Sequence, residues 1–157
     1  MFFIVYAVDI NRKIDMAENN EYLDKLKNRN IKPTSLRILI LKTMLQESRA
    51  VSILDLENLL DTVDKSTIFR TITLFLSHHL IHRIDDGSGA LKYAVCGNSC
   101  SCSVEDLHSH FYCNVCHKTY CLEGIDVPIV KLPIGFSLQS INYVLKGVCP
   151  DCSIEEK

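Results

Sequence analysis

The sequence predicts an α+β fold made of two unlike halves, and three of its features point to this class. Apolar residues recur at helical spacing between about residues 21 and 80. Two short apolar runs, residues 81–84 and 90–95, then flank a glycine-containing turn, which is typical of a β-hairpin. All eight cysteines follow, between Cys96 and Cys152, among further strand-like runs. A helical half that ends in a hairpin is therefore expected to precede a small strand-rich half.

Helices are expected before the hairpin, each with a recognisable start. The first covers residues 21–29 and has Tyr22, Leu23 and Leu26 on one face. The next three start at Thr34 or Pro33, at Ser52, and at Asp64 or Ser66, which are residue types favoured at helix N-termini. In the second half, strands are expected over residues 111–113, 119–122 and 137–148. A short helix over residues 126–132 is expected between the last two strands.

Helices followed by a hairpin form the order of a winged-helix DNA-binding domain, in which the helix before the hairpin enters the major groove. That helix carries Lys65, Ser66, Thr67 and Arg70, whose cations and hydroxyls suit phosphates and base edges. An ordinary helical bundle with a polar surface is an equally good interpretation of the pattern alone. The formal net charge of −2 supplies no global basic field that would favour DNA.

The start of the chain is apolar but has neither a basic leader nor the length of a membrane span. We therefore expect a cytoplasmic protein without a membrane partner, whose cysteines stay reduced and available as metal ligands. Residues 1–16 form an N-terminal extension, which is either the product of an upstream start or a short strand, and the sequence does not decide its role.

Four cysteines form two Cys-x-x-Cys pairs, Cys113 with Cys116 and Cys149 with Cys152. Each pair can present both sulfurs to one ion, and four thiolates are the closed tetrahedral set typical of structural zinc. The alternatives are two disulfides, a redox dithiol or free buried thiols. A redox dithiol would occur once, between a strand and a helix. Two such pairs in one small domain therefore favour a zinc site.

A second group of ligand-type residues surrounds the first pair. Its members are His82, Cys96, Cys100, Cys102, His108, His110, Cys121 and Glu123. Nitrogen and sulfur donors together favour zinc over iron, manganese or magnesium. His108 and His110 would share one face of a strand, because side chains alternate along it. The alternative is a pair of exposed strand histidines that bind nothing.

From about Leu23 to Cys152, the layout resembles the ferric uptake regulator (Fur) family of metal-responsive repressors. The matching segments are residues 33–37, 64–72, 80–84, 108–116, 135–136 and 146–152. The resemblance implies a winged-helix domain followed by a small α/β dimerisation domain. It also implies a homodimer that binds palindromic operators in double-stranded DNA once a regulatory metal is loaded. It further implies DNA contacts by Arg37, Arg70 and Phe69, although Phe69 lacks the hydroxyl of the family's usual tyrosine.

The chain departs from the iron, manganese and peroxide-sensing members at several ligand positions, and Cys121 replaces a carboxylate. The zinc-sensing (Zur) branch is more similar, with a wing ligand, a cysteine three residues after a wing tyrosine, and later histidines. This resemblance implies a regulatory zinc site of His82, Cys96, His108 and His110. Asp85 is the rival of His82, and Glu123 is a further candidate. Cys102 and Cys121 are rivals of Cys96, because an insertion at residues 97–106 makes the correspondence ambiguous there.

The resulting expectation is a zinc-responsive repressor of metal-uptake genes that holds one structural and one regulatory zinc per protomer. Its predicted parts are the extension 1–16, a winged helix 17–95, a hinge or metal loop 96–106 and a dimerisation domain 107–157. Alternatives of the same fold are an iron- or manganese-responsive regulator and a thiol- or peroxide-responsive one. A zinc-ribbon module that binds protein is the alternative from another class. The sequence shows no P-loop and no nucleophile–base pair, so no enzyme activity is expected.

Overall fold

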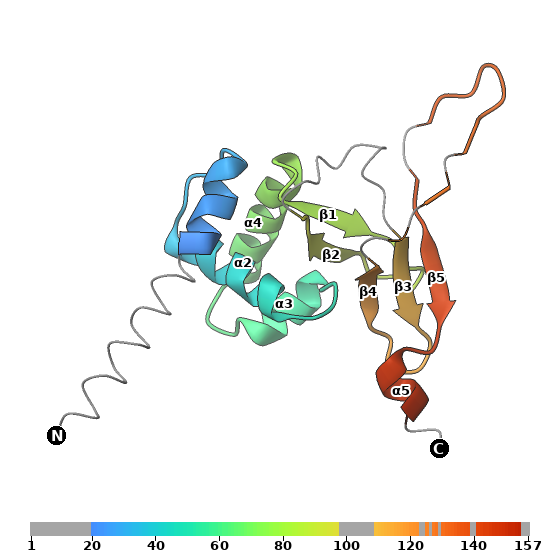
Figure 1. The fold of residues 1–157 in the computed structure, drawn as a ribbon. Coiled ribbons are helices and arrows are strands. Elements are labelled where there is room, and N and C mark those ends of the chain that lie inside the picture. The colour runs from blue at the N-terminus through green and yellow to red at the C-terminus, as the bar shows by residue number, and fades with distance from the viewer. Residues whose placement is uncertain are drawn as a thin grey trace, which may run out of the picture.

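The computed structural model describes residues 20–97, 109–122, 125, 127–128, 130–138 and 141–154. They form two lobes (Figure 1). The helical lobe, residues 20–97, holds a helix at residues 20–28, α2 (Ser35–Gln46), α3 (Ile53–Leu59), α4 (Lys65–Ser77), β1 (Ile81–Ile84) and β2 (Lys92–Val95). The sheet lobe, the described residues from 109 onward, holds β3 (Ser109–Cys113), β4 (Thr119–Leu122), β5 (Val144–Gly147) and α5 (Pro150–Ile154).

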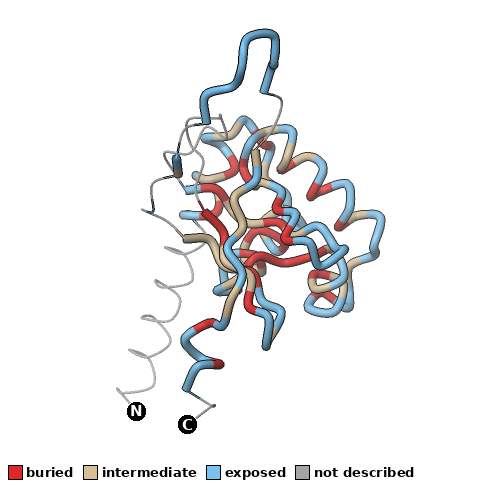
Figure 2. The backbone as a smooth tube through the Cα atoms, turned by 90° about the vertical axis from the view of Figure 1, so that its right-hand side faces the viewer, coloured by how far each residue is buried: buried red, intermediate tan, exposed pale blue. Residues whose placement is uncertain are grey.

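Side-chain caps start the three main helices where the sequence predicts them. The Thr34 side chain accepts a hydrogen bond from the backbone N–H of Arg37, and Asp64 accepts one from Thr67. Ser52 forms a complete capping box with Asp55. The helices pack around one apolar core, whose fully buried members include Leu26, Ile40, Leu41, Leu56, Ile68, Ile72 and Phe75. This core accounts for most of the buried (red) chain in Figure 2.

The hairpin forms as predicted, with β1 and β2 antiparallel and Ile81 opposite Val95. In the sheet lobe, β3 is the central strand; it pairs antiparallel with β4 and parallel with β5. Residues 137–148 were expected to form one long strand, but among the described residues of this segment only Val144–Gly147 form a strand. The lobe therefore has three short strands, and its buried centre consists of Cys113, Cys149 and Cys152.

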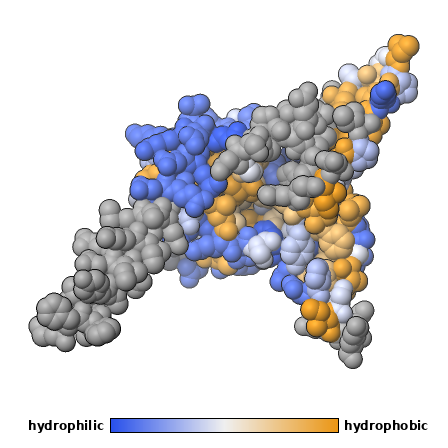
Figure 3. Space-filling model, viewed as in Figure 1, coloured by the Kyte–Doolittle hydropathy of each residue, from blue (hydrophilic) through white to orange (hydrophobic). Residues whose placement is uncertain are grey.

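The prediction of a short helix over residues 126–132 is wrong, since the described residues of this segment have no helical structure. Pro128 and Pro133 lack the backbone N–H that a helix interior needs. The described part of residues 125–138 instead projects from the sheet as an exposed segment (Figures 1 and 2). Apolar side chains, including Ile134 and Phe136, line it (Figure 3).

The two lobes contact each other through Thr119, the first residue of β4. Its carbonyl accepts a hydrogen bond from the backbone N–H of Ala50 at 2.8 Å. Its hydroxyl donates to a carboxylate oxygen of Asp86 in the hairpin turn, and both side chains are only 1% exposed. Burial alone would raise the pKa of Asp86, but the hydrogen bonds from Ser88 and Thr119 outweigh it, and the pKa is lowered. Asp86 is therefore a buried carboxylate that depends on these donors.

No helix in the described part of the chain combines the length and the apolar character that a membrane crossing requires.

We expect Thr119→Val to lower the free energy of unfolding by about 1–3 kcal/mol, because it removes one donor from a buried carboxylate. Denaturant unfolding of the zinc-loaded protein, at one fixed protein concentration, measures the change. Thr73→Val is the matched control: Thr73 is exposed on α4, and its hydroxyl bonds only within that helix. An equal effect of the two substitutions would contradict a stabilising role for the Thr119–Asp86 hydrogen bond.

Candidate metal centres

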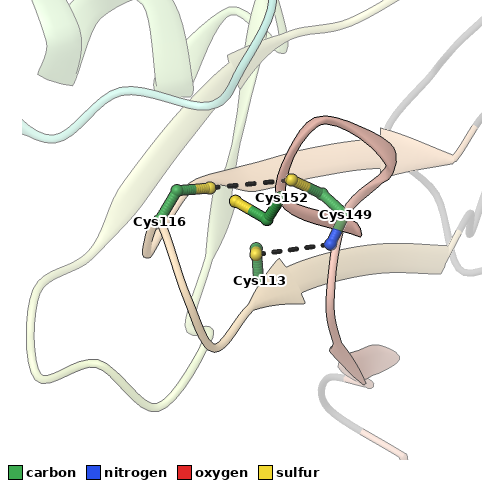
Figure 4. Close-up of side chains that lie close together, drawn as sticks. All are labelled: Cys113, Cys116, Cys149 and Cys152. Carbon is green, nitrogen blue, oxygen red and sulfur yellow. Dashed lines mark hydrogen bonds between the residues drawn. The ribbon is translucent and has the colours of Figure 1, made fainter. Parts of the chain in front are cut away.

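The two Cys-x-x-Cys pairs meet at one point in the sheet lobe. Cys113 ends β3 and Cys116 lies in the turn after it, whereas Cys149 directly precedes α5 and Cys152 lies within it (Figure 4). The four sulfur atoms all lie within 4.8 Å of one another, and Cys116 and Cys149 are 3.7 Å apart. A tetrahedral zinc with bonds of about 2.3 Å places its sulfurs roughly 3.8 Å apart. The arrangement therefore fits a zinc ion.

Local backbone geometry brings the two pairs together. The parallel pairing of β3 with β5 places Cys113 opposite Gly147, two residues before Cys149. The backbone N–H of Asn114 donates to the carbonyl of Gly147 at 2.7 Å, and that of Cys149 donates to the sulfur of Cys113 at 3.3 Å. These bonds hold the first turn against the start of α5, so the register of β3 and β5 positions all four thiols.

The pKa values of Cys113 and Cys152 are shifted in opposite directions. Burial would raise the pKa of Cys113, but backbone N–H groups, chiefly those of Cys116 and Cys149, outweigh it and lower the pKa to about 6. Hydrogen bonding to Cys149, together with burial, raises the pKa of Cys152 to about 12. The set therefore retains protons when no cation is present. A divalent cation at its centre would favour four thiolates.

A second cluster joins the two lobes. His82 comes from β1, His110 from β3 and Cys121 from β4, and one donor atom of each lies within 4.8 Å of the others. The Nε2 atom of His82 is 3.1 Å from Nε2 of His110 and 3.9 Å from the sulfur of Cys121. Zinc bonds of about 2.0–2.3 Å imply donor separations of roughly 3.3–3.8 Å. Two imidazoles and a thiol at these distances fit a zinc ion.

The predicted ligands of the regulatory metal differ in where the structure places them. His82 and His110 are brought together, and Cys121, considered as a rival ligand, lies with them. Cys96 is buried nearby, but its sulfur lies 3.4 Å from Nδ1 of His82, the other ring nitrogen. The Asp85 carboxylate accepts a hydrogen bond from Gly87 in the hairpin turn and does not belong to the cluster. Outside the described residues lie His108, Cys102 and Glu123.

The helix predicted to contact DNA is α4, and its first turn is polar and exposed. Phe69 is 58% exposed, so its ring is accessible to a partner. Lys65 pairs with Glu57 at 3.1 Å, while Ser66 and Thr67 donate their hydroxyls to the capping carboxylate of Asp64. These hydroxyl bonds lower the pKa of Asp64 to about 2, so this carboxylate stays ionised. DNA phosphates that approached this turn would meet the negative charge of Asp64.

Two arginines lie in a cleft beside this turn. A cleft of about 220 Å³ lies between the start of α2 and α4, and both guanidinium-bearing residues line it. Its lining residues are Thr34, Leu36, Arg37, Thr67, Arg70, Thr71 and Leu74. Arg37 donates to the carbonyl of Lys32 at 2.6 Å, and Arg70 donates to the hydroxyl of Ser66 at 2.9 Å. Each guanidinium has further N–H groups that could bind a phosphate or a guanine.

Solved structures of metal regulators share this fold. A zinc uptake regulator in complex with zinc and DNA is 20% identical, with 88% of this chain and 94% of that chain covered at a TM-score of 0.62. A zinc-bound manganese uptake regulator is 17% identical, with 82% and 98% covered at 0.55. The ferric uptake regulator from Pseudomonas aeruginosa with manganese is 19% identical, with 81% and 96% covered at 0.53.

No protein-family model and no curated protein matches the chain. At such low identities, the structural similarity establishes the fold. The predicted class, a winged helix followed by a small α/β domain, is confirmed.

We expect Cys149→Ser to lower the tightly held zinc by one ion per protomer, because a closed thiolate set loses affinity when one ligand is removed. The sheet lobe should then unfold while the helical lobe keeps its own apolar core. Zinc analysis after removal of exchangeable metal, together with amide exchange, measures both effects. Ser153→Ala, a change in the same helix, should leave the zinc in place. Full zinc retention in Cys149→Ser would contradict the assignment.

Proposed function

We propose that this chain is a zinc-responsive transcription repressor that binds DNA as a homodimer. The observation that carries this proposal is the cluster of His82, His110 and Cys121, because its donors come from both lobes. One ion bound there would be attached to the hairpin of the helical lobe and to two strands of the sheet lobe at once. Metal binding could therefore change how the DNA-binding helix is held.

The two metal centres are suited to different tasks. The set of Cys113, Cys116, Cys149 and Cys152 is closed and lies within one lobe, as expected of a permanent structural zinc. The second cluster has mixed donors and depends on the contact between lobes. Its affinity should therefore be lower, and its occupancy should follow the metal supply. On this proposal each protomer holds one structural and one regulatory zinc.

Metal loading would act by population shift. Without the second ion, the helical lobes of the dimer sample several orientations, and few of them match two half-sites of a palindromic operator. An ion that binds the closed arrangement more tightly raises the share of molecules in that arrangement. The DNA contacts would come from Arg37, Arg70, Phe69 and the first turn of α4 with Lys65, Ser66 and Thr67. Repression of metal-uptake genes would follow from occlusion of the promoter.

The donor set supports zinc as the sensed metal. Thiolate and imidazole favour zinc, whereas iron(II) and manganese(II) sites contain more oxygen donors. Cys121 supplies sulfur in the cluster itself. His108 and Glu123 stay predicted candidates for a further donor. A zinc uptake regulator bound to zinc and DNA is among the similar structures, which supports the same choice.

The exposed apolar segment supports the homodimer. Ile134 and Phe136 are among the most exposed large apolar residues of the chain, and Val130, Leu132 and Leu138 lie close in sequence. Several exposed apolar side chains in one segment are typical of an interaction site. A second copy of the sheet lobe, which carries the same surface, would cover it symmetrically.

DNA duplexes that the zinc-loaded protein binds can be selected from a random pool. We expect zinc at a low buffered free concentration to strengthen binding of the protein to these duplexes. Manganese(II) or anaerobic iron(II) at the same free concentration should not, because both prefer oxygen donors. Fluorescence anisotropy in metal buffers measures the affinities. Binding supported by iron or manganese but not by zinc would indicate a regulator of the same fold for those metals. Absence of duplex binding even at low salt would favour a protein-binding zinc module.

We expect Arg37→Ala to weaken DNA binding and to reduce the slope of log affinity against log salt by about 0.9 per protomer, the value for one lost phosphate contact. Titrations at four or more salt concentrations measure this slope. Lys118→Ala removes an equal charge from the exposed β3–β4 turn and should leave the slope unchanged. Equal slopes for the two variants would place the DNA elsewhere.

A further inference from the structure

The imidazole of His82 contacts a different thiol through each of its two nitrogens. Its Nε2 atom faces His110 at 3.1 Å and Cys121 at 3.9 Å. Its Nδ1 atom faces the sulfur of Cys96 at 3.4 Å. The two nitrogens lie on different edges of the ring, so one ion at the His82–His110–Cys121 cluster binds through Nε2 only. Cys96 does not belong to that cluster.

From these contacts we propose that Cys121 is the sulfur ligand of the regulatory metal, and that Cys96 is a positioning residue that orients His82. The inference rests on the proposed function only in taking the second cluster as a metal site. It reverses the assignment that the spacing after Tyr93 suggests, in which Cys96 itself binds the metal.

The backbone supports the role given to Cys121. His110 and Cys121 are direct partners in the antiparallel pairing of β3 and β4, so their side chains leave the sheet on the same face. His110 is additionally held by its backbone N–H, which donates to the carbonyl of Tyr143 at 2.9 Å. The nitrogen and sulfur donors of the sheet lobe are thus adjacent before any metal arrives. His82 approaches this pair from the hairpin of the other lobe.

The backbone also supports the role given to Cys96. Its N–H donates to the carbonyl of Leu80 at 3.0 Å, just beyond the paired residues of β1 and β2. The side chain is 6% exposed, and its sulfur lies on the Nδ1 edge of the His82 ring. Cys96 is therefore held beside the same hairpin as His82. It lies on the Nδ1 side of the imidazole ring, whereas His110 lies on the Nε2 side.

The contact between Nδ1 of His82 and the sulfur of Cys96 bears on metal binding through the tautomer of His82. A neutral imidazole has one protonated nitrogen and one lone pair. Metal binding at Nε2 requires the lone pair there, so the proton must be on Nδ1, from which it can be donated to the sulfur of Cys96. Ligating histidines commonly donate their second N–H in this way, and loss of such an acceptor lowers metal affinity about 10–100-fold.

Cobalt(II) distinguishes the two thiols, because a thiolate bonded to cobalt gives an intense ultraviolet charge-transfer band. Zinc first fills the four-cysteine site, and cobalt is then added to the second site alone. We expect Cys121→Ser to abolish the band. We expect Cys96→Ala to keep the band while cobalt affinity falls about 10–100-fold. Cys96→Ser should recover much of that affinity, because a hydroxyl can also accept from Nδ1–H.

Loss of the band in Cys96→Ser would overturn the proposal, whatever Cys121→Ser shows. A band that persists in Cys121→Ser would also overturn it. Retention of one zinc per protomer in the four-cysteine site shows that each variant is folded. Side-chain nitrogen NMR of the zinc-loaded wild type requires no variant: it should show His82 protonated at Nδ1, and protonation at Nε2 would overturn the proposal. Wild-type protein that binds cobalt but no DNA would contradict the proposed function and leave this inference standing.

Discussion

The buried centre of the sheet lobe consists of Cys113, Cys149 and Cys152, with Cys116, Phe111 and Tyr120 partly buried around it. Sulfurs occupy the place where a larger domain would have leucines and isoleucines. Small domains with so little apolar burial usually need a metal or disulfides to fold. Cys113, Cys116, Cys149 and Cys152 form no disulfide, so an ion is the remaining means of joining them. The stability of β3, β4 and β5 therefore depends on this one cluster.

The second cluster depends on the first through the strands. Cys113 ends β3, the strand that carries His110, and β4 pairs with β3 and carries Cys121. Disturbing the four thiols would shift both donors of the sheet lobe together. Thr119, two residues before Cys121, contacts Asp86 and Ala50 of the helical lobe. Strand β4 thus connects the lobe of the four-cysteine site with the contact between lobes and with the second cluster.

Local sequence signals predicted much of this fold. The caps at Thr34, Ser52 and Asp64 follow from residue type and from the apolar periodicity that begins after them. The meeting of the two Cys-x-x-Cys pairs follows from the chemistry of zinc. The position of Cys121 beside His110 could not be predicted in this way, because it depends on which residue of β4 lies opposite His110. Burial of Asp86 was also missed, since its partner Thr119 is 33 positions away in sequence.

The contact between lobes bears on how a metal could control DNA binding. The Thr119–Asp86 hydrogen bond and the Ala50–Thr119 backbone bond exist without any ion, so metal is not the sole link. A hydrogen bond to a charged group contributes about 1.5–3 kcal/mol, which alone biases an equilibrium by roughly 10–150-fold. An ion at the second cluster adds to these contacts, and it shifts the population only if it binds the closed arrangement more tightly than the open ones. Full switching requires about a 10⁴-fold difference in metal affinity between the two, and a site whose ligands span both lobes can supply such a difference.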